Sequence, residues 1–316
     1  MKTKIAVLAL IAVTAGVFTY KQTKHIPPSD LRDAVGDVSD SGTGIADVKK
    51  VNVDLPAPKA NEDISRSYAP TTNAITWVTI PGGTFMMGST GKGQDFENAK
   101  PIHKVTVKTF RMSKTEVTVG QYSECVYRGA CKAPYTRHSD KCNWGKPERR
   151  FYPINCVNWV MAEAYAKFVG ARLPSESQWE YAARSAGKNL KYPWGNEKPT
   201  DDKAVICVKN DLRFCGTTMP VCSKPAGNTK QGLCDMAGNV EEWIDDQFES
   251  SYEYAHGDGS ASYGSGMPGS ESYTTVVRGG SYYSVPHDYR LQTAGRFHGV
   301  MNEKVTSDDV GFRIVK

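Results

Sequence analysis

The eight cysteines of this 316-residue chain are the residues whose type and spacing most directly predict chemistry. All of them lie in the middle of the chain, and their number is even. No C-x-x-C pair, which thioredoxin-like redox sites and zinc knuckles require, accompanies them, and no histidine lies at metal-ligand spacing. The pattern therefore predicts structural disulfides formed in an oxidising compartment. Many connectivities are open to eight cysteines, and we favour pairing in chain order. The four predicted pairs are Cys125–Cys131, Cys142–Cys156, Cys207–Cys215 and Cys222–Cys234.

Other signatures of catalysis do not occur in the sequence. It contains no G-x-S-x-G, no G-x-x-x-x-G-K and no H-E-x-x-H, so hydrolase, nucleotide-binding and zinc-protease functions have no support. The net charge of +5, from 39 Lys and Arg against 34 Asp and Glu, is small and dispersed. We therefore expect no nucleic-acid partner.

Seven stretches of the chain form a pattern in a fixed order. They are WVTIPGGTFMMGS (77–89), KTEVTVGQY (114–122), NWVMAEAYAKFVGARLPSESQWEYAAR (158–184), YPWGNE (192–197), GLCDMAGNVEEW (232–243), VVRGGSY (276–282) and DVGFRIV (309–315). Together they resemble the formylglycine-generating enzyme, or sulfatase-modifying-factor, domain. The resemblance implies an α+β, loop-rich formylglycine-generating-enzyme-like fold that is related to C-type lectins.

The resemblance also implies a copper site, which this sequence departs from. Enzymes of the family oxidise a sulfatase cysteine to formylglycine with two cysteines that bind copper(I) just after RGGS. Here Ser284 and Tyr289 occupy those positions, and no cysteine follows Cys234. Copper(I) is a soft ion that requires thiolate ligands. We therefore expect neither copper nor formylglycine generation.

A cleft kept from the family would be lined by polar side chains. The expected lining residues are Glu241, Ser281, Ser284, His287, Tyr289, Arg296 and Asp309. Two carboxylates, an imidazole and a guanidinium in one cleft could carry out acid–base chemistry or bind a polar ligand. The alternative is that they are solvated side chains of a site that has lost its function.

The stretch DMAGNVEEW resembles the calcium loop of the family. The match implies calcium bound by the side chains of Asp235 and Glu242 and by the backbone carbonyls of Gly238 and Val240. Calcium prefers this mixture of carboxylate and carbonyl oxygens. The alternative is a turn capped by Asp235, with Glu242 at the surface.

The elements that position these residues can be predicted from local patterns. Two capping boxes, Thr118 with Gln121 and Ser175 with Gln178, predict helix starts. Another helix is expected over 159–169. Strands are expected at 77–80, 84–87, 103–110, 276–278 and 311–315, and a long surface loop rich in Gly, Ser and Tyr at 249–275. Few helices, short strands and many irregular connections are typical of an α+β domain.

The amino-terminal region indicates export. Lys2 and Lys4 precede an apolar run over residues 5–20, so residues 1–20 are expected to be a signal peptide or a signal anchor that tethers the chain to a membrane. Residues 21–74 contain several prolines and few aromatic side chains, which predicts a disordered linker. Residues 75–316 then form the folded domain. We expect this domain to be extracytoplasmic: periplasmic, secreted or membrane-anchored.

Three functions remain open at this point. The first is an accessory protein of the cell envelope that binds a protein, peptide or glycan through the cleft and the long loop. The second is an enzyme with copper-independent, possibly oxidative chemistry in the same cleft, with Glu241, His287 or Asp309 as general base. The third is a rigid structural part of an envelope assembly.

Overall fold

The computed structural model describes residues 74–91, 94–209, 215–264, 274–300 and 306–316. The expected signal segment at 1–20 and the expected linker up to residue 73 lie outside these residues. Among the helices that the structure describes, none has both the length and the apolar character needed to cross a bilayer.

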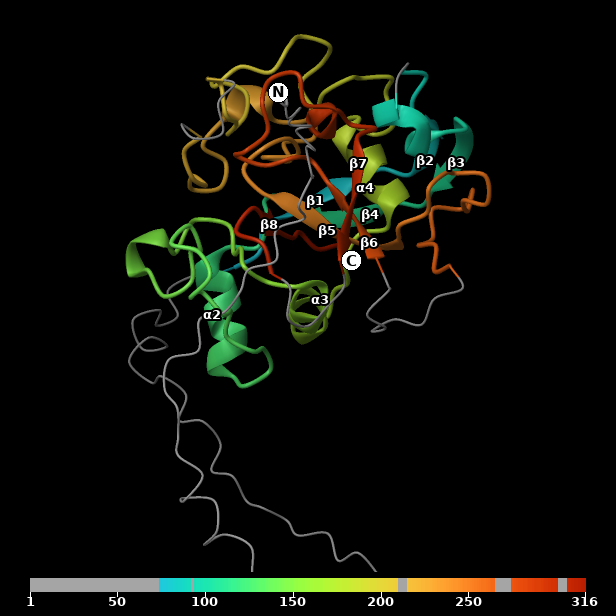
Figure 1. The fold of residues 1–316 in the computed structure, drawn as a ribbon. Helices are drawn as coiled ribbons and strands as arrows, with labels where there is room; N and C mark the ends of the chain where they lie inside the picture. The colour runs from blue at the N-terminus through green and yellow to red at the C-terminus, as the bar shows by residue number, and fades with distance from the viewer. Residues whose placement is uncertain (1–73, 92–93, 210–214, 265–273, 301–305) are drawn as a thin grey trace, which may run out of the picture. The chain divides into compact units, whose positions relative to one another are not determined.

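Within the described residues, eight short strands form three sheets. Figure 1 shows how these strands are arranged. Strand β1 (Trp77–Ile80) pairs with β4 (Phe110–Ser113), and β2 (Gly83–Met87) pairs with β3 (His103–Val107), both antiparallel. The third sheet has the order β7-β6-β5-β8. Its strands are β5 (Glu241–Gln247), β6 (Thr274–Arg278), β7 (Arg296–Val300) and β8 (Val310–Gly311). Strands β5 and β8 are parallel, whereas the other pairs of this sheet are antiparallel.

Five of these strands differ from the sequence prediction. The run expected as one strand over 103–110 is divided into β3 and β4 by a turn, and Thr109 accepts the Gly82 N–H on its hydroxyl at 2.9 Å. The run expected at 311–315 contributes only Gly311 to a regular strand. Strands β5 and β7 were not predicted, because their residues alternate poorly and their pairing partners are distant in sequence.

The helices begin where the capping patterns predict. Helix α2 (Val119–Tyr127) and helix α4 (Glu176–Ala183) each carry a complete capping box. Helix α3 (Trp159–Phe168) is capped by the Asn158 side chain, which accepts the Met161 N–H at 2.9 Å. Short 3-10 helices occur at Gln94–Ala99, Pro147–Arg149, Pro225–Gly227 and Tyr289–Leu291.

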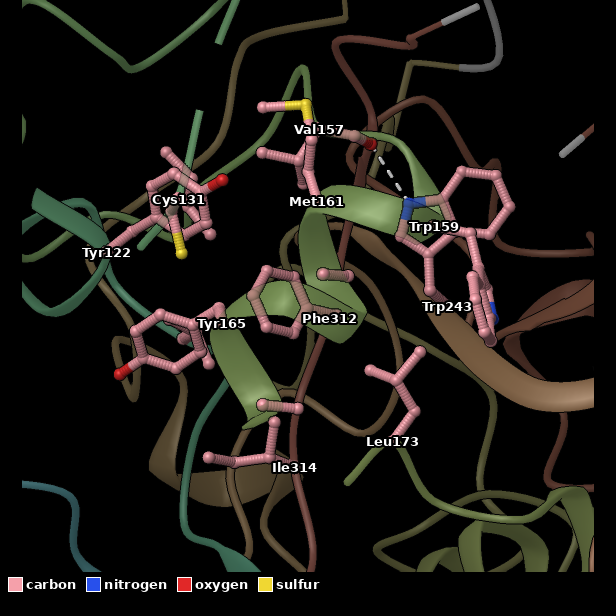
Figure 2. Packing of buried hydrophobic residues seen from close by; sticks show 14 of the residues in the cluster. Tyr122, Cys131, Val157, Trp159, Met161, Tyr165, Leu173, Trp243, Phe312 and Ile314 are labelled. Carbon is pink, nitrogen blue, oxygen red and sulfur yellow. Dashed lines mark hydrogen bonds between the residues drawn. The ribbon is translucent and has the colours of Figure 1, made fainter. Parts of the chain in front are cut away.

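An aromatic core surrounds α3 (Figure 2). The rings of Tyr122, Tyr165 and Phe312 contact one another with centroid distances of 5.6–6.4 Å. The buried indole of Trp243 donates a hydrogen bond to the Val157 carbonyl at 3.0 Å. This core connects α2 and α3 to the strand β5 on which the candidate site begins.

A second core contains a buried ion network that ties α4 to the third sheet. Arg278, on β6, contacts Glu180 at 2.6 Å and Glu176 at 3.2 Å, and all three side chains are almost fully buried. Arg184 contacts the same Glu180 at 2.9 Å. Buried ion pairs require this kind of mutual compensation, because an unpaired buried charge is strongly destabilising.

The four disulfides confirm the predicted pairing. They join Cys125 to Cys131, Cys142 to Cys156, Cys207 to Cys215 and Cys222 to Cys234. No cysteine of the chain is left free. Loops of 6 to 14 residues are closed in this way, and each such bond contributes about 2–3 kcal/mol in the chain-entropy account.

Candidate functional site

Glu241 and Asp309 lie side by side where β5 and β8 begin. The Glu241 N–H donates to the Asp309 carbonyl at 2.8 Å, as the parallel pairing of the two strands requires. The Glu241 side chain is only 5% exposed. Its Oε1 accepts a hydrogen bond from Arg290 Nη1 at 2.9 Å, and Arg290 Nη2 also contacts Asp288 at 2.7 Å. One guanidinium therefore bridges two carboxylates.

Burial and neighbouring charge change the proton affinity of this group. Burial, followed by the negative charge of Asp309, raises the pKa of Glu241 to about 8, against the opposing effect of Arg290. Although burial acts in the opposite direction, the hydrogen bonds and charge of Arg290 lower the pKa of Asp288. Two carboxyl groups that share one arginine thus have pKa values shifted in opposite directions, upward for Glu241 and downward for Asp288.

The two serines of the expected cleft join this group. Ser281 Oγ donates to Asp309 Oδ2 at 3.2 Å, and the Ser281 N–H donates to Ser284 Oγ, also at 3.2 Å. Both serines are fully buried. Gly280 has a φ of +66°, and a Cβ there would lie 2.7 Å from Ser284 Oγ, so the turn requires glycine at this position.

His287 and Tyr289 lie beside this group, on an open cavity of about 440 Å³. Asp288, Arg290 and Phe297 also line it, and the Tyr289 ring packs edge-on against Phe96 at 5.9 Å. The structure thus brings six of the seven expected cleft residues into one neighbourhood. Sequence reasoning missed Asp288 and Arg290. Asp288 lies between His287 and Tyr289 in the sequence, and Arg290 follows Tyr289. Their position beside two expected cleft residues could have indicated both.

Arg296 is the seventh residue, and its expected place in the cleft is wrong. Its guanidinium forms two hydrogen bonds with Glu176, at 2.7 and 2.8 Å, and stacks on the Tyr252 ring at 4.3 Å. Glu176 opens α4 and is a buried carboxylate whose other cationic partner is Arg278, at 3.2 Å. Arg296 therefore compensates a charge of the second core and lines a different cavity.

The expected calcium loop is a tight turn that leads into β5. Asp235 adopts a positive φ of +55°, and its carboxylate accepts the Cys222 N–H at 2.6 Å. Glu242 is fully buried, not at the surface. Its Oε1 and Oε2 accept from Arg313 at 2.7 Å each, and its Oε2 also accepts the Trp179 indole N–H at 2.7 Å.

Glu116 adds a third buried carboxyl group that sequence reasoning missed, although it lies in the quoted KTEVTVGQY stretch. Its Oε1 accepts the Asn239 amide at 3.0 Å, whereas its buried Oε2 has no hydrogen-bond partner in the described part of the chain. Burial, followed by the charge of Asp235, raises the pKa of Glu116 well above its ordinary value. Three buried carboxyl groups thus face the single guanidinium of Arg313. The calcium ligands that the resemblance implies are Asp235, Glu242 and the carbonyls of Gly238 and Val240, a mixture of oxygen donors that suits a hard cation.

One histidine lies close to a cysteine, contrary to the expectation from spacing. His138 Nε2 is 3.7 Å from Cys142 Sγ, and these atoms and Cys156 Sγ lie within 4.8 Å of one another. Because the two sulfurs form a disulfide, they offer no thiolate to a metal ion.

The fold and the site together define a loop-rich α+β domain with four disulfides and a buried acidic group at the start of its largest sheet. Comparison with known proteins identifies its family. Residues 64–316 match the sulfatase-modifying factor enzyme 1-like domain, and the chain belongs to this family.

Individual relatives agree with this assignment. The formylglycine-generating enzyme of Streptomyces coelicolor is 30% identical over 287 residues, which cover 75% of this chain and 87% of the enzyme. A bovine protein named inactive C-alpha-formylglycine-generating enzyme 2 is 30% identical over 228 residues, 56% of this chain and 72% of that protein. The solved structure of PvdO from Pseudomonas aeruginosa superimposes with a TM-score of 0.63 at 25% identity and covers 78% of this chain and 95% of PvdO. The formylglycine-generating-enzyme-like fold is thereby confirmed.

Proposed function

We propose that this chain is an exported member of the family that does not generate formylglycine and that serves as a binding or accessory protein of the cell envelope. The single observation that carries the proposal is that every cysteine is oxidised to a disulfide. All eight are consumed in disulfides. No thiolate remains for copper(I), which binds hydroxyl and phenol oxygens poorly.

The surroundings of Ser284 and Tyr289 support the same conclusion. Ser284 Oγ is buried and already accepts the Ser281 N–H, and the Tyr289 ring packs against Phe96. Neither side chain offers a soft donor. The existence of a bovine relative whose name describes it as inactive is consistent with the loss of this activity on the same scaffold.

Export and a binding role rest on separate features. The basic and apolar pattern of residues 1–20 and the disulfides both favour an oxidising, extracytoplasmic compartment. The described part of the Gly-, Ser- and Tyr-rich loop carries exposed tyrosines, which suit adaptable contacts with a protein, peptide or glycan.

The absence of formylglycine-generating activity is tested with a peptide that contains the sulfatase motif. The purified chain, with disulfides intact, is incubated with copper and the peptide, and aldehyde is measured by mass spectrometry beside the Streptomyces coelicolor enzyme as positive control. We expect aldehyde from the control only. Aldehyde formed by this chain would overturn the proposal.

A second candidate, an enzyme with copper-independent chemistry, is favoured by one observation. Glu241 and Asp309 stand together with Ser281 at the place where the family keeps its active site. Comparison of exported metabolites from a deletion strain complemented with wild type or with Glu241→Gln tests it. An enzymatic function is supported if a precursor accumulates in both the deletion strain and the Glu241→Gln strain, and if this precursor differs by two hydrogens from the metabolite that the wild-type strain exports. Identical metabolite profiles in all strains contradict it.

We also propose that calcium binds at Asp235 and Glu242. Terbium can replace calcium in oxygen sites, and the Trp179 indole hydrogen-bonded to Glu242 is well placed to sensitise its luminescence. Saturable terbium emission that calcium displaces, together with a lower melting temperature in chelator, is the expected result. A melting temperature that chelator leaves unchanged, without terbium emission, would contradict the proposal.

A further inference from the structure

A second cavity, of about 430 Å³, lies away from the Glu241 group. It is bordered by the carboxyl end of β5, the first turn of α4 and residues 249–264 of the long loop. This volume falls within the range of small-molecule sites. The residues that give the cavity its character are Glu176, Asp246, Glu249, Glu253, Tyr252 and Tyr254.

The walls of this cavity carry more negative than positive charge. Four of the lining residues are carboxylic acids, and Arg296 is the single lysine or arginine among the described residues that line it. Because Arg296 is held by Glu176 through two hydrogen bonds, its charge is already compensated. No described lysine or arginine forms an ion pair with Asp246, Glu249 or Glu253.

Asp246 is the most unusual of these acids. It is 6% exposed, and its two oxygens accept the backbone N–H groups of Glu176 and Ser262 at 2.7 and 2.9 Å. Asp246 lines the cavity, and no lysine or arginine of the described residues forms an ion pair with it. A buried carboxyl group of this kind is costly to ionise unless a cation arrives.

Aromatic side chains form the rest of the wall. Tyr254 is 85% exposed at the rim, and its ring faces are free to cover a ligand. The rings of His103 and Tyr252 lie 5.0 Å apart, and the buried His103 Nε2 has no hydrogen-bond partner in the described region. Aromatic faces and carboxylates together are the environment in which proteins bind organic cations.

We propose that this cavity binds an organic cation, an ammonium or guanidinium group on a short apolar stem. Asp246 and Glu249 accept its hydrogen bonds, and Tyr254 covers its face. The inference deepens the proposed binding function and rests on it. A bound cation would also balance the negative charge of the cavity, in which four acids surround an arginine, Arg296, that is already paired with Glu176.

The cation is tested by calorimetry with two probes of equal length, pentylamine and 1-pentanol, on the full chain with disulfides intact. Pentylamine should bind at least about tenfold more tightly, because a charge-assisted hydrogen bond is stronger than a neutral one. Glu249→Gln should abolish that preference. Glu249 is exposed, so this variant is expected to fold. The matched control Glu197→Gln changes an acid outside the cavity that pairs with Lys203 and should leave the preference intact.

A further arm identifies the source of the cation. A blocked Gly-Arg-Gly peptide that binds more tightly than pentylamine and pentylguanidine assigns the site to a polypeptide side chain. Tighter binding of pentylamine or pentylguanidine than of the peptide assigns it to a free amine or guanidine. Equal binding of pentylamine and 1-pentanol, or no binding of any cationic probe, overturns the inference. Because the aldehyde assay does not involve this cavity, its outcome separates failure of the inference from failure of the proposed function.

Discussion

Replacing Asp246 with asparagine should change how the stability of the chain depends on pH. Burial, followed by the charge of Glu176, raises the pKa of Asp246 to about 8 from an ordinary value of 3.8. The folded chain therefore keeps a proton that the unfolded chain has lost. The contribution of Asp246 to the free energy of unfolding is therefore fully present below about pH 4 and is lost as the pH rises through about 8.

The size of the effect follows from the proton linkage. One retained proton changes the free energy of unfolding by about 1.4 kcal/mol per pH unit, or roughly 4 kcal/mol between pH 5 and pH 8. Asparagine resembles the neutral carboxyl group and does not titrate. Relative to wild type, Asp246→Asn should therefore gain roughly 4 kcal/mol over this interval.

Urea denaturation followed by tryptophan fluorescence at pH 5, 6, 7 and 8, with the disulfides intact, measures this difference. Titrating groups that do not interact with Asp246, Glu241 among them, contribute equally to both chains and cancel. Asp201→Asn, at an exposed position, provides a matched control for the same chemical change away from the cavity. A difference between wild type and Asp246→Asn that is the same at every pH would refute the reasoning.

Three further predictions concern the core and the site. Arg313→Met should destabilise the chain by about 3–5 kcal/mol in urea denaturation, because it leaves the buried Glu242 without its partner; a loss below about 1 kcal/mol would contradict this account. Phe312→Ala should cost about 3–5 kcal/mol in the same assay, since it removes a fully buried ring; an unchanged urea midpoint would argue against the packing. The double variant Ser284→Cys with Tyr289→Cys should gain copper(I) binding in a competition assay with a chromogenic chelator; a variant no better than wild type would show that the scaffold has lost the family geometry.

Local patterns in the sequence were sufficient for the helices and the disulfides. The capping box of Thr118 with Gln121 depends on residues three apart, and both of its hydrogen bonds are present. The disulfides close loops of at most 14 residues, so chain-order pairing needed little knowledge of the fold. Short-range preferences decide such elements.

Long-range pairing decided the features that were missed. Arg296 was assigned to the cleft by resemblance, but its partner Glu176 lies 120 residues away in sequence. Strand β5 begins within a stretch expected only as a calcium loop, and its neighbours β6 and β8 come from much later in the chain. The bridge from Arg290 to Glu241 likewise joins residues 49 positions apart. No local pattern reports contacts of this kind.

Loss of formylglycine generation follows most directly from the absence of a thiolate for copper(I) in the folded chain. The direct measurement is copper content after anaerobic equilibration of the non-reduced protein with copper(I) and removal of unbound metal. The account predicts no stoichiometric copper. One equivalent of copper retained per folded chain would contradict it.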